Sequence, residues 1–465
     1  MDSLHTDKAD FADDYWHVNA GSKKIHAARI KGRFATFKKI TGSLWLIFFL
    51  LPYMRWHGRQ AVMFDISGRK FYLFSATIWP QDIWMLSLVL VLLAISLFAI
   101  TAIAGRVFCG YFCFQTAWAD LFTYIEGKIE GPPQKRIVLD KAPWTLKKAL
   151  IKLPKHFLWL VISVLTGITF TLYFEDAYSL WHSFLTLDAP PVAWVVVGLF
   201  TAGTYILAGF MREQVCFWLC PYARIQGVMY DKDTLLPTYD YVRGEPRGKI
   251  RRDENKDKKG DCVDCNLCVA VCPTGVDIRR GQQEGCITCG LCIDACNFMM
   301  DKVGKPGGLI RYSSLDEMEG IIQPPLYKRP RVIIYTIILF TAFLGIAYGL
   351  TNIKTIDLSV SHERQPLFVM LSDGSIQNKY SLKLVNRMGK DVDVKVTVAG
   401  PDGLNMSGVQ KNILMKMGKV TPVTAFIKIP SASLKDDITP IFFKVVNSKT
   451  DEVYKEYESM FVSPK

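Results

Sequence analysis

Long apolar stretches divide this chain into membrane-spanning and water-soluble parts. A run of about 20 apolar residues is long enough to cross a bilayer as a helix. Four runs meet this criterion: Ile83–Ala104, Phe157–Phe174, Val192–Met211 and Val332–Leu350. A fifth, Thr41–Trp56, is shorter and contains Pro52, so a re-entrant or interfacial segment is its alternative interpretation. The pattern predicts a polytopic α-helical membrane protein with about five spans.

A different periodicity follows the last apolar run. Residues Asp391–Val398 alternate strictly between polar and apolar side chains, which is the period of a half-buried strand. Other segments read as strands too: Tyr380–Val385, Val423–Ile429, Ile441–Val446 and Val453–Val462. Such short strands, separated by turn residues, predict an all-β, immunoglobulin-like domain over residues 351–465. Its sequence contains no catalytic constellation, so we interpret it as a binding module.

The distribution of lysine and arginine sets the expected orientation. These residues number 8 up to residue 40, 4 in residues 54–82, 9 in residues 105–156, none in residues 175–191 and 19 in residues 212–331. Because cytoplasmic loops retain Lys and Arg, this alternation predicts a cytoplasmic N-terminus and a periplasmic C-terminal domain in a bacterial inner membrane. The net charge of +13 then has its cause in the cytoplasmic loops, and we expect no nucleic-acid binding.

Eight of the 12 cysteines form two closely spaced runs. Cys262–Cys272, followed by Pro273, has the spacing C-x2-C-x2-C-x3-C-P, and Cys286–Cys296 repeats it with Asn297 in place of the proline. Bacterial ferredoxins bind two [4Fe–4S] clusters with this spacing, and the fourth cysteine of each run ligates the other cluster. Two zinc sites are the alternative, although zinc sites are usually built from paired C-x2-C knuckles. The predicted ligand sets are Cys262, Cys265, Cys268 and Cys296 for one cluster and Cys286, Cys289, Cys292 and Cys272 for the other.

The remaining cysteines form two C-x3-C pairs, Cys109 with Cys113 and Cys216 with Cys220, which follow the second and the fourth span. This repeat predicts that the pairs meet at the cytoplasmic membrane face. If each helix continued through its pair, both thiols would share a helical face, and the dipole at the helix C-terminus would favour a cation. Four sulfur ligands suit Cu(I) or a third iron–sulfur cluster. Ordinary packing of buried cysteines is the alternative.

These features give a predicted domain order. Residues 1–40 form a cytoplasmic tail, residues 41–230 a membrane domain with four spans, and residues 231–260 a charged linker. Residues 261–312 form the ferredoxin-like domain, residues 313–331 a second linker, and residues 332–350 the fifth helix. The first linker contains the run Arg251–Lys259, which we interpret as a solvated segment. A docking patch for an acidic redox donor is the alternative.

The motifs resemble those of the cytochrome c oxidase accessory protein family CcoG, also called FixG or RdxA. Besides the cysteine motifs, the resemblance includes the following segments: Gly32-Arg-Phe34, Phe64-Asp-Ile66, Trp79-Pro-Gln-Asp82, Arg243-Gly-Glu-Pro-Arg247 and Gly308-Leu-Ile-Arg-Tyr312. One departure is Phe114, because the family usually has proline after the preceding cysteine. This departure concerns the expected local turn and not the thiols.

The resemblance implies an activity and partners that spacing alone does not provide. Proteins of this family are linked to the assembly of cbb3-type cytochrome oxidase and look like cupric reductases, which would make Cys109, Cys113, Cys216 and Cys220 the copper-reducing site. The implied partners are the membrane, oxidase subunits or copper chaperones, and an unidentified electron donor. A general quinol- or ferredoxin-linked electron carrier is one alternative function. A non-redox copper-binding assembly factor with structural clusters is the other.

Overall fold

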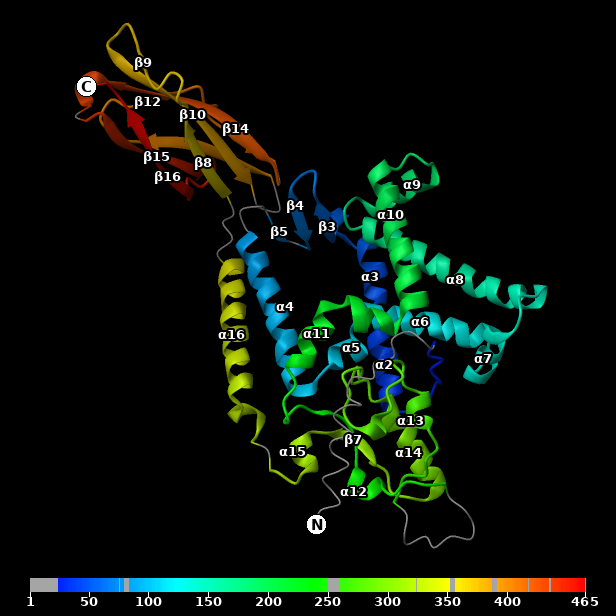
Figure 1. Ribbon diagram of the computed structural model, residues 1–465. Helices are drawn as coiled ribbons and strands as arrows, with labels where there is room; N and C mark the ends of the chain where they lie inside the picture. The colour runs from blue at the N-terminus through cyan, green and yellow to red at the C-terminus, as the bar shows by residue number, and fades with distance from the viewer. Residues whose placement is uncertain are drawn as a thin grey trace. The chain divides into compact units, whose positions relative to one another are not determined.

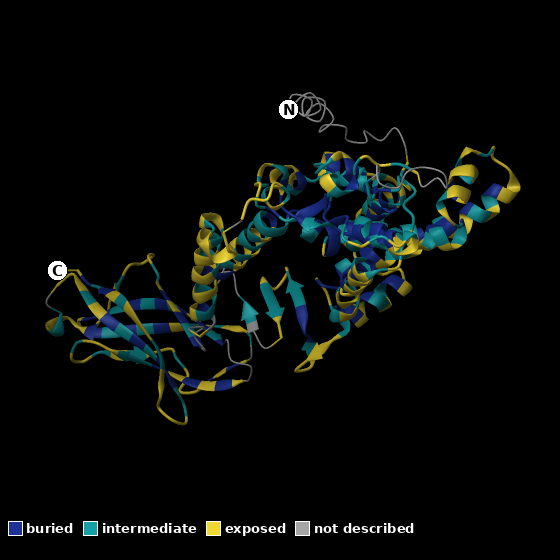
Figure 2. Ribbon diagram, turned by 90° about the horizontal axis from the view of Figure 1, so that it is seen from below, coloured by how far each residue is buried: buried dark blue, intermediate teal, exposed yellow. Residues whose placement is uncertain are grey.

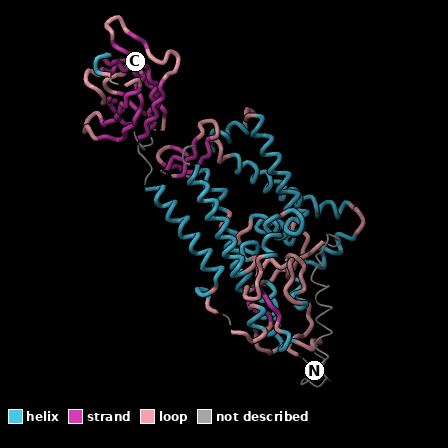
Figure 3. The backbone as a smooth tube through the Cα atoms, turned by 60° about the vertical axis from the view of Figure 1, so that its left-hand side comes forward, coloured by secondary structure: helices cyan, strands magenta, loops and turns pink. Residues whose placement is uncertain are grey.

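The computed structural model describes residues 24–74, 76–78, 83–249, 260–322, 324–351, 356–386, 391–416, 418–434 and 436–464. Three predicted features lie outside the described residues: most of the N-terminal tail, the motif Trp79-Pro-Gln-Asp82 and the charged run Arg251–Lys259. Contacts divide the chain into two compact units. One comprises residues up to 72 and from 79 to 346, and the other residues 73–78 and from 347 onward. Helices dominate the first unit and strands the second (Figure 3).

The helices of the membrane part follow the predicted order (Figure 1). They are α2 (Arg33–Ser43), α3 (Leu46–Leu50), α4 (Ile83–Ala104), α5 (Val107–Tyr111), α6 (Phe114–Ile129), α7 (Pro133–Lys141), α8 (Leu146–Thr171), α9 (Ala177–Leu185), α10 (Pro191–Thr204), α11 (Pro221–Val228) and α16 (Pro330–Thr351). Two π-helical segments, Tyr205–Met211 and Val215–Leu219, connect α10 to α11. α4 and α16 lie side by side, and a Cβ on Gly345 would be 3.0 Å from Leu88.

In the part of the chain that the structure describes, five helical segments are long and apolar enough to cross a membrane, which confirms the predicted number of spans. They are Arg33–Tyr53, Trp84–Ala104, Leu146–Thr171, Pro191–Met211 and Pro330–Gly349. These helices carry many exposed apolar side chains, and Figure 2 marks the exposed residues along them in yellow. Since lipid tails cover such side chains in a bilayer, the exposure is expected of membrane helices. The chain is therefore a membrane protein.

The first span differs from its predicted bounds. It begins at Arg33 rather than Thr41, and its last turn contains Pro52. Trp56, the predicted end, instead lies in the short strand β1 (Arg55–Trp56). The apolar pattern missed the start because charged residues such as Lys38 and Lys39 interrupt the first turns of α2. The chain therefore enters this span eight residues earlier than hydrophobicity alone indicates.

The ferredoxin-like part consists of short elements around buried cysteines. They are β6 (Leu236–Tyr239), α12 (Tyr241–Gly244), α13 (Leu267–Ala270), α14 (Leu291–Val303), β7 (Ile310–Ser313) and α15 (Leu315–Met318). β6 pairs antiparallel with β7, from Leu236 opposite Ser313 to Tyr239 opposite Ile310. All four residues of β6 are buried, so this portion of the predicted charged linker belongs to the folded core.

The second unit is a β-sandwich. Its strands are β8 (Ile356–His362), β9 (Val369–Met370), β10 (Ser375–Asn386), β11 (Val392–Ala399), β12 (Asn405–Ser407), β13 (Ile413–Met415), β14 (Val420–Pro430), β15 (Ile438–Asn447) and β16 (Val453–Val462). One sheet has the order β12-β14-β10-β8, with β9 beside β10, and the other has the order β13-β11-β15-β16. Alternate residues of both sheets, including Val394, Leu382 and Phe443, form the core. This arrangement confirms the predicted immunoglobulin-like domain.

Candidate functional site

The two cysteine runs fold into two copies of the same loop. Asp264 and Asn266 in the first run have φ angles of 51° and 57°, and Thr288 and Gly290, at the equivalent positions of the second, have 55° and 69°. Residues in this left-handed region turn the chain tightly. A helix begins directly after each loop, α13 after Asn266 and α14 after Gly290. The repeated turns hold the first three cysteines of each run around one side of a cavity.

Each cavity is completed by one cysteine from the other run. The first cavity is lined by Cys262, Cys265, Cys268 and Cys296. The second cavity is lined by Cys272, Cys286, Cys289 and Cys292. The structure thus gathers the eight thiols into the same two sets of four that the spacing predicts as ligand sets. Their role as cluster ligands stays a prediction.

The donor atoms suit a cluster better than a single ion. Among the described residues, no three cysteine, histidine or acidic side chains come together as ligands of one metal ion. A zinc ion needs its four ligands around one centre. In a [4Fe–4S] cluster each thiolate binds a different iron, so the four sulfur atoms stay further apart. Thiols that line a cavity without converging on one point therefore fit the cluster.

Burial makes these thiols weak acids. Removal from water raises the pKa of Cys268 and of Cys286 to about 12, and that of Cys289 to about 11. Such thiols stay protonated at neutral pH while no metal is bound. Because iron binds the thiolate, ligation must displace these protons.

The C-x3-C pairs do not lie on continuous helices. Cys109 lies in α5, which ends before Cys113, and Cys113 is the N-cap of α6. Cys216 lies in the second π-helical segment, and Cys220 is the N-cap of α11. The expected shared helical face is therefore wrong. The expected dipole effect is wrong too, since Cys113 and Cys220 stand at helix N-termini, where the dipole does not favour a cation.

The departure at Phe114 leaves this turn unchanged. Phe114 is the first residue of α6, just as Pro221 is the first residue of α11. Proline suits this position because its fixed φ matches a helix and its missing N–H has no intrahelical partner there. Phenylalanine occupies it without altering the cap, and Cys113 keeps the extended ψ of 130°. The two C-x3-C segments therefore end in the same way.

The structure brings the four thiols of these pairs together. Burial raises the pKa of Cys109 to about 12, and Cys113, Cys216 and Cys220 are near enough to Cys109 to act on this pKa as well. Sγ of Cys109 also lies 3.3 Å from Oε1 of Gln226, which belongs to α11, the helix that begins after the other pair. The two halves of the repeat therefore meet.

One of these thiols touches the wall of the second cavity. Cys109 packs in one buried cluster with Ile287 and Cys289. Gly110 permits the approach, because a Cβ there would be 2.6 Å from the carbonyl oxygen of Ile287 and 3.1 Å from Cα of Cys289. The hydroxyl of Tyr111 donates a 2.8 Å hydrogen bond to the carbonyl of Cys289. α5 is therefore fixed on the loop that lines the second cavity.

The segment that leads into α2 ties the ferredoxin-like part to the membrane helices. The amide of Ala28 donates a 2.7 Å hydrogen bond to the carbonyl of Ala270. The amide of Ala35 donates a buried 2.8 Å bond to the Asp294 carboxylate in α14. Since α2 packs on both α14 and α5, it holds the two cysteine systems in one unit.

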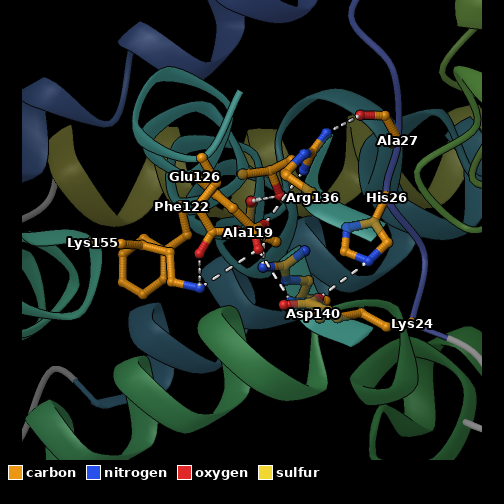
Figure 4. A network of polar contacts seen from close by, with 12 residues as sticks. Lys24, His26, Ala27, Ala119, Phe122, Glu126, Arg136, Asp140 and Lys155 are labelled. Carbon is orange, nitrogen blue, oxygen red and sulfur yellow. Dashed lines mark hydrogen bonds and ion pairs between the residues drawn. The ribbon is translucent and has the colours of Figure 1, made fainter. Parts of the chain in front are cut away.

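A buried charge network fixes the other C-x3-C segment. In Figure 4, Glu126 of α6 lies between Arg136 of α7 and Lys155 of α8. Glu126 is fully buried, and its carboxylate forms a 2.7 Å ion pair with Arg212. Arg212 ends the first π-helical segment with a φ of 45°, four residues before Cys216. The network thereby positions the chain at the start of the second C-x3-C pair.

A further cavity, the junction cavity, lies where these parts meet. Asp120 of α6 lines it together with Glu213 and Cys216, and Thr274 and Ile287 of the ferredoxin-like part form another wall. Carboxylate oxygens and a C-x3-C sulfur therefore border the same space.

Reasoning from the sequence missed the charged residues that position these sites. Lys38 and Arg212 are nearly buried at the ends of apolar spans, and Glu126 is fully buried beside them. Their charged partners are distant in sequence, so the spacing of residues along the chain gave no indication of these ion pairs. The available signal was the presence of ionisable residues at the ends of membrane segments, which is costly unless they are paired.

Three regions of the chain match known families. Residues 211–315 match a family described as a 4Fe-4S dicluster domain, and residues 85–132 match one described as a 4Fe-4S binding domain. Residues 346–464 match the IG-like fold at the C-terminal of FixG. The matches agree with the folds described above for the cysteine-containing and C-terminal parts.

Similar proteins cover most of the chain. It is 40% identical over 454 residues to the nitrogen fixation protein FixG of Rhizobium meliloti, covering 88% of this chain and 87% of that protein. It is 42% identical over 396 residues to protein RdxA of Cereibacter sphaeroides, covering 82% and 84%. A solved FixG-related protein from Vibrio parahaemolyticus matches with a TM-score of 0.22 and 21% identity, over 24% of this chain and 100% of that one. By these full-length relatives, the chain belongs to the FixG/RdxA family and is a membrane iron–sulfur electron-transfer protein.

Proposed function

We propose that this protein reduces Cu(II) to Cu(I), and that it does so for the assembly of a cbb3-type cytochrome oxidase. In this proposal the first and second cavities hold two [4Fe–4S] clusters, which supply single electrons when bound. Copper is the substrate and is reduced at the thiols of Cys109, Cys113, Cys216 and Cys220, and one electron converts one Cu(II) into one Cu(I). A one-electron donor restores the reduced protein. Oxidase subunits or copper chaperones receive the product.

One observation carries the proposal: Cys109, one of the four membrane thiols, packs in one buried cluster with Ile287 and Cys289, which line the second cavity. Cys109, Ile287 and Cys289 share this buried cluster, so the membrane thiols and the second cavity meet in one core. Short separation favours transfer of an electron between the two sites. The protein's contribution is to hold this contact through Gly110 and Tyr111.

The ligand types support copper as the substrate. Thiolates select Cu(I), whereas Cu(II) prefers harder oxygen and nitrogen donors. The junction cavity presents the carboxylates of Asp120 and Glu213 beside the thiol of Cys216. An ion that moves from the carboxylates to the thiols therefore meets donors that increasingly favour its reduced form.

The charge distribution supports a cytoplasmic reaction. All twelve cysteines lie in segments that the Lys and Arg count assigns to the cytoplasmic side. That compartment is reducing, so free thiols and clusters persist in it. The C-terminal domain, which contains no cysteine, then lies in the periplasm.

The test uses the full-length protein purified without oxygen. Its clusters are reduced with dithionite, the excess is removed, and stoichiometric Cu(II) is added while iron–sulfur absorbance and a Cu(I)-specific chelator are followed. We expect cluster oxidation and Cu(I) formation to proceed together. Clusters that stay reduced would exclude copper as the acceptor.

The matching variant changes both thiols of one pair, Cys216→Ser with Cys220→Ser. We expect it to abolish Cu(I) formation and to leave the absorbance of both clusters intact. Trp218→Phe is the control, because Trp218 lies between the two cysteines but is 58% exposed. Undiminished copper reduction in the double variant would refute the assignment of these thiols.

A second function is favoured by one observation. The 4Fe-4S binding match over residues 85–132 includes Cys109 and Cys113, so the membrane thiols are also candidates for a third cluster in a general electron carrier. Iron analysis separates the two functions: two clusters give about eight irons per chain and three give about twelve. Twelve irons, with loss of about four in the Cys216→Ser/Cys220→Ser variant, would favour the carrier.

A further inference from the structure

Lys38 is a buried cation at the boundary between the membrane helices and the second cavity. Its residue surface is only 9% exposed, although it lies in a helix that is apolar further along. Its ammonium nitrogen is 2.7 Å from Oδ2 of Asp120, which is itself 39% exposed and lines the junction cavity. Burying a lysine is costly, and one ion pair with a partly exposed carboxylate offsets only part of the desolvation cost.

The face of α2 that carries Lys38 packs on the loop of the second cavity. Phe34, one turn before Lys38, lies over Gly290, where a Cβ would be 2.8 Å from the aromatic ring. Ala35 donates to Asp294 in α14. Residues three and four positions apart share a helical face. Lys38 therefore lies on the side of α2 that faces Cys289 and its neighbours.

Two opposite charges act on the second cavity from this side. Lys38 is 9% exposed and lies on the face of α2 that packs on the loop of the second cavity, so little solvent screens its positive charge from that cavity. The carboxylate of Asp120 is 39% exposed, so solvent screens its opposing negative charge more strongly. An electron added to a cluster makes it more negative, and a nearby cation stabilises that state.

The cation beside the first cavity is more completely neutralised. Arg279 forms ion pairs of 2.6 Å with Asp264 and 2.8 Å with Asp277. Two carboxylates therefore face one guanidinium there, whereas one partly exposed carboxylate faces Lys38. The two cavities thus have the same thiol donors but different surrounding charge.

We propose that Lys38 raises the reduction potential of the cluster held in the second cavity, so that an electron passes from the first cavity to the second and waits beside Cys109. Lys38 acts on the cluster through its charge and contacts no substrate. This inference rests on the proposed occupancy of the two cavities, but it does not require copper to be the acceptor.

The test is a potentiometric titration of the full-length protein in detergent, without oxygen, in which the reduced clusters are followed by electron paramagnetic resonance. In Lys38→Gln we expect one component to become harder to reduce by about tenfold, or about 59 mV for a one-electron couple. The other component should stay unchanged. Lys39→Gln is the matched control, since the adjacent Lys39 is exposed and should shift neither component.

Two further variants give effects that a merely structural role would not produce. Asp120→Asn removes the opposing charge and should move the same component in the opposite direction. Arg279→Gln should move the other component, which identifies the cluster of the first cavity. Lys38→Arg should restore most of the wild-type potential.

The outcomes separate this inference from the proposed function. The role of Lys38 would be overturned if neither component changed its potential in Lys38→Gln and Asp120→Asn. It would also be overturned if both components shifted equally. If Lys38→Gln does not fold, the sign of the Asp120→Asn shift decides, and a downward shift or no shift overturns the inference. Wild-type protein with the iron of fewer than two clusters would overturn the occupancy of the cavities themselves.

Discussion

The first and second cavities have the same donors in different surroundings. Cys265 in the first cavity is the one exposed cysteine among the twelve, all of which are described. The first cavity is walled by its own domain, including Tyr239 and Met300. The second cavity is covered by other parts of the chain as well: α2 lies over Gly290 and α5 over Cys289.

The difference indicates separate tasks for two copies of one motif. A site with an exposed cysteine is accessible to a partner that delivers electrons. A site enclosed by membrane helices is protected from solvent and touches the thiols that follow the spans. Because hydrogen bonding and solvent exposure set cluster potentials, the covering elements and not the cysteine spacing distinguish the two.

The largest predicted effect concerns the difference between the first and second cavities. It compares one cysteine substitution at the equivalent position of each run. Cys289→Ser should abolish Cu(I) formation by dithionite-reduced protein, because Cys109 packs in one buried cluster with Ile287 and Cys289 of the second cavity. Cys265→Ser should retain about half the Cu(I) yield per chain, because one of two one-electron clusters remains. The measurement is chelator-trapped Cu(I) against iron content. Equal losses of Cu(I) formation in the two variants would contradict the assigned difference between the two cavities.

Next in size is the effect of removing one carboxylate from the membrane part and one from the ferredoxin-like part. Glu126→Gln removes the carboxylate that pairs with the buried Arg212 and Arg136 and should cost about 3–5 kcal/mol of unfolding free energy. Asp261→Asn, beside the first cavity, breaks a 2.6 Å ion pair with Arg243 that is 27% and 26% exposed, and should cost about 0–1 kcal/mol. Denaturant unfolding in detergent measures both, and similar costs would contradict the assigned difference in burial.

A smaller effect follows from acidification. Burial alone would raise the pKa of Glu126, but Arg212, Lys24 and Lys155 outweigh it and hold this pKa at about 2, below the usual 4.5. A carboxyl whose pKa is lower in the folded state stabilises the fold above the unfolded pKa. That stabilisation is lost as pH falls from about 4.5 toward 2. Unfolding midpoints measured at several pH values over this range should fall for the wild type and fall less for Glu126→Gln.

The smallest predicted effect concerns the contact between α5 and the second cavity. Gly110→Ala places a Cβ 2.6 Å from the Ile287 carbonyl and should destabilise the protein by about 1–3 kcal/mol while slowing Cu(I) formation. Gly127→Ala in α6 is the control, since nothing lies within 4 Å of a Cβ there. That change should stabilise by about 0.5–1 kcal/mol. Unaltered copper kinetics in Gly110→Ala would show that this contact is not needed for transfer.

The sequence predicted those features that depend on local spacing. The interval between Cys262 and Cys272, repeated after Cys286, was enough to group the thiols correctly in space. Apolar length was enough for the spans, because a helix must cover the bilayer thickness. Strict alternation in Asp391–Val398 was enough to predict a strand of the sandwich.

Features that depend on distant packing could not be predicted in this way. α5 ends between Cys109 and Cys113 where it meets the loop around Ile287, far along the chain. β6 lies in the predicted charged linker. The sequence did not indicate this strand, because its partner β7 comes some seventy residues later. Lys38 is buried only because Asp120, from another helix, lies opposite it.

Each cysteine run contributes its fourth cysteine to the cavity of the other run. This arrangement fixes the order in which the two sets of four thiols are completed during synthesis. Chains leave the ribosome from the N-terminus, so Cys262, Cys265 and Cys268 emerge first. Their fourth companion, Cys296, is the last cysteine of the protein. The set of the second cavity is already complete at Cys292. The thiol set of the first cavity is therefore the first to begin and the last to be completed. In the growing polypeptide, all four thiols of the second cavity are present before all four of the first.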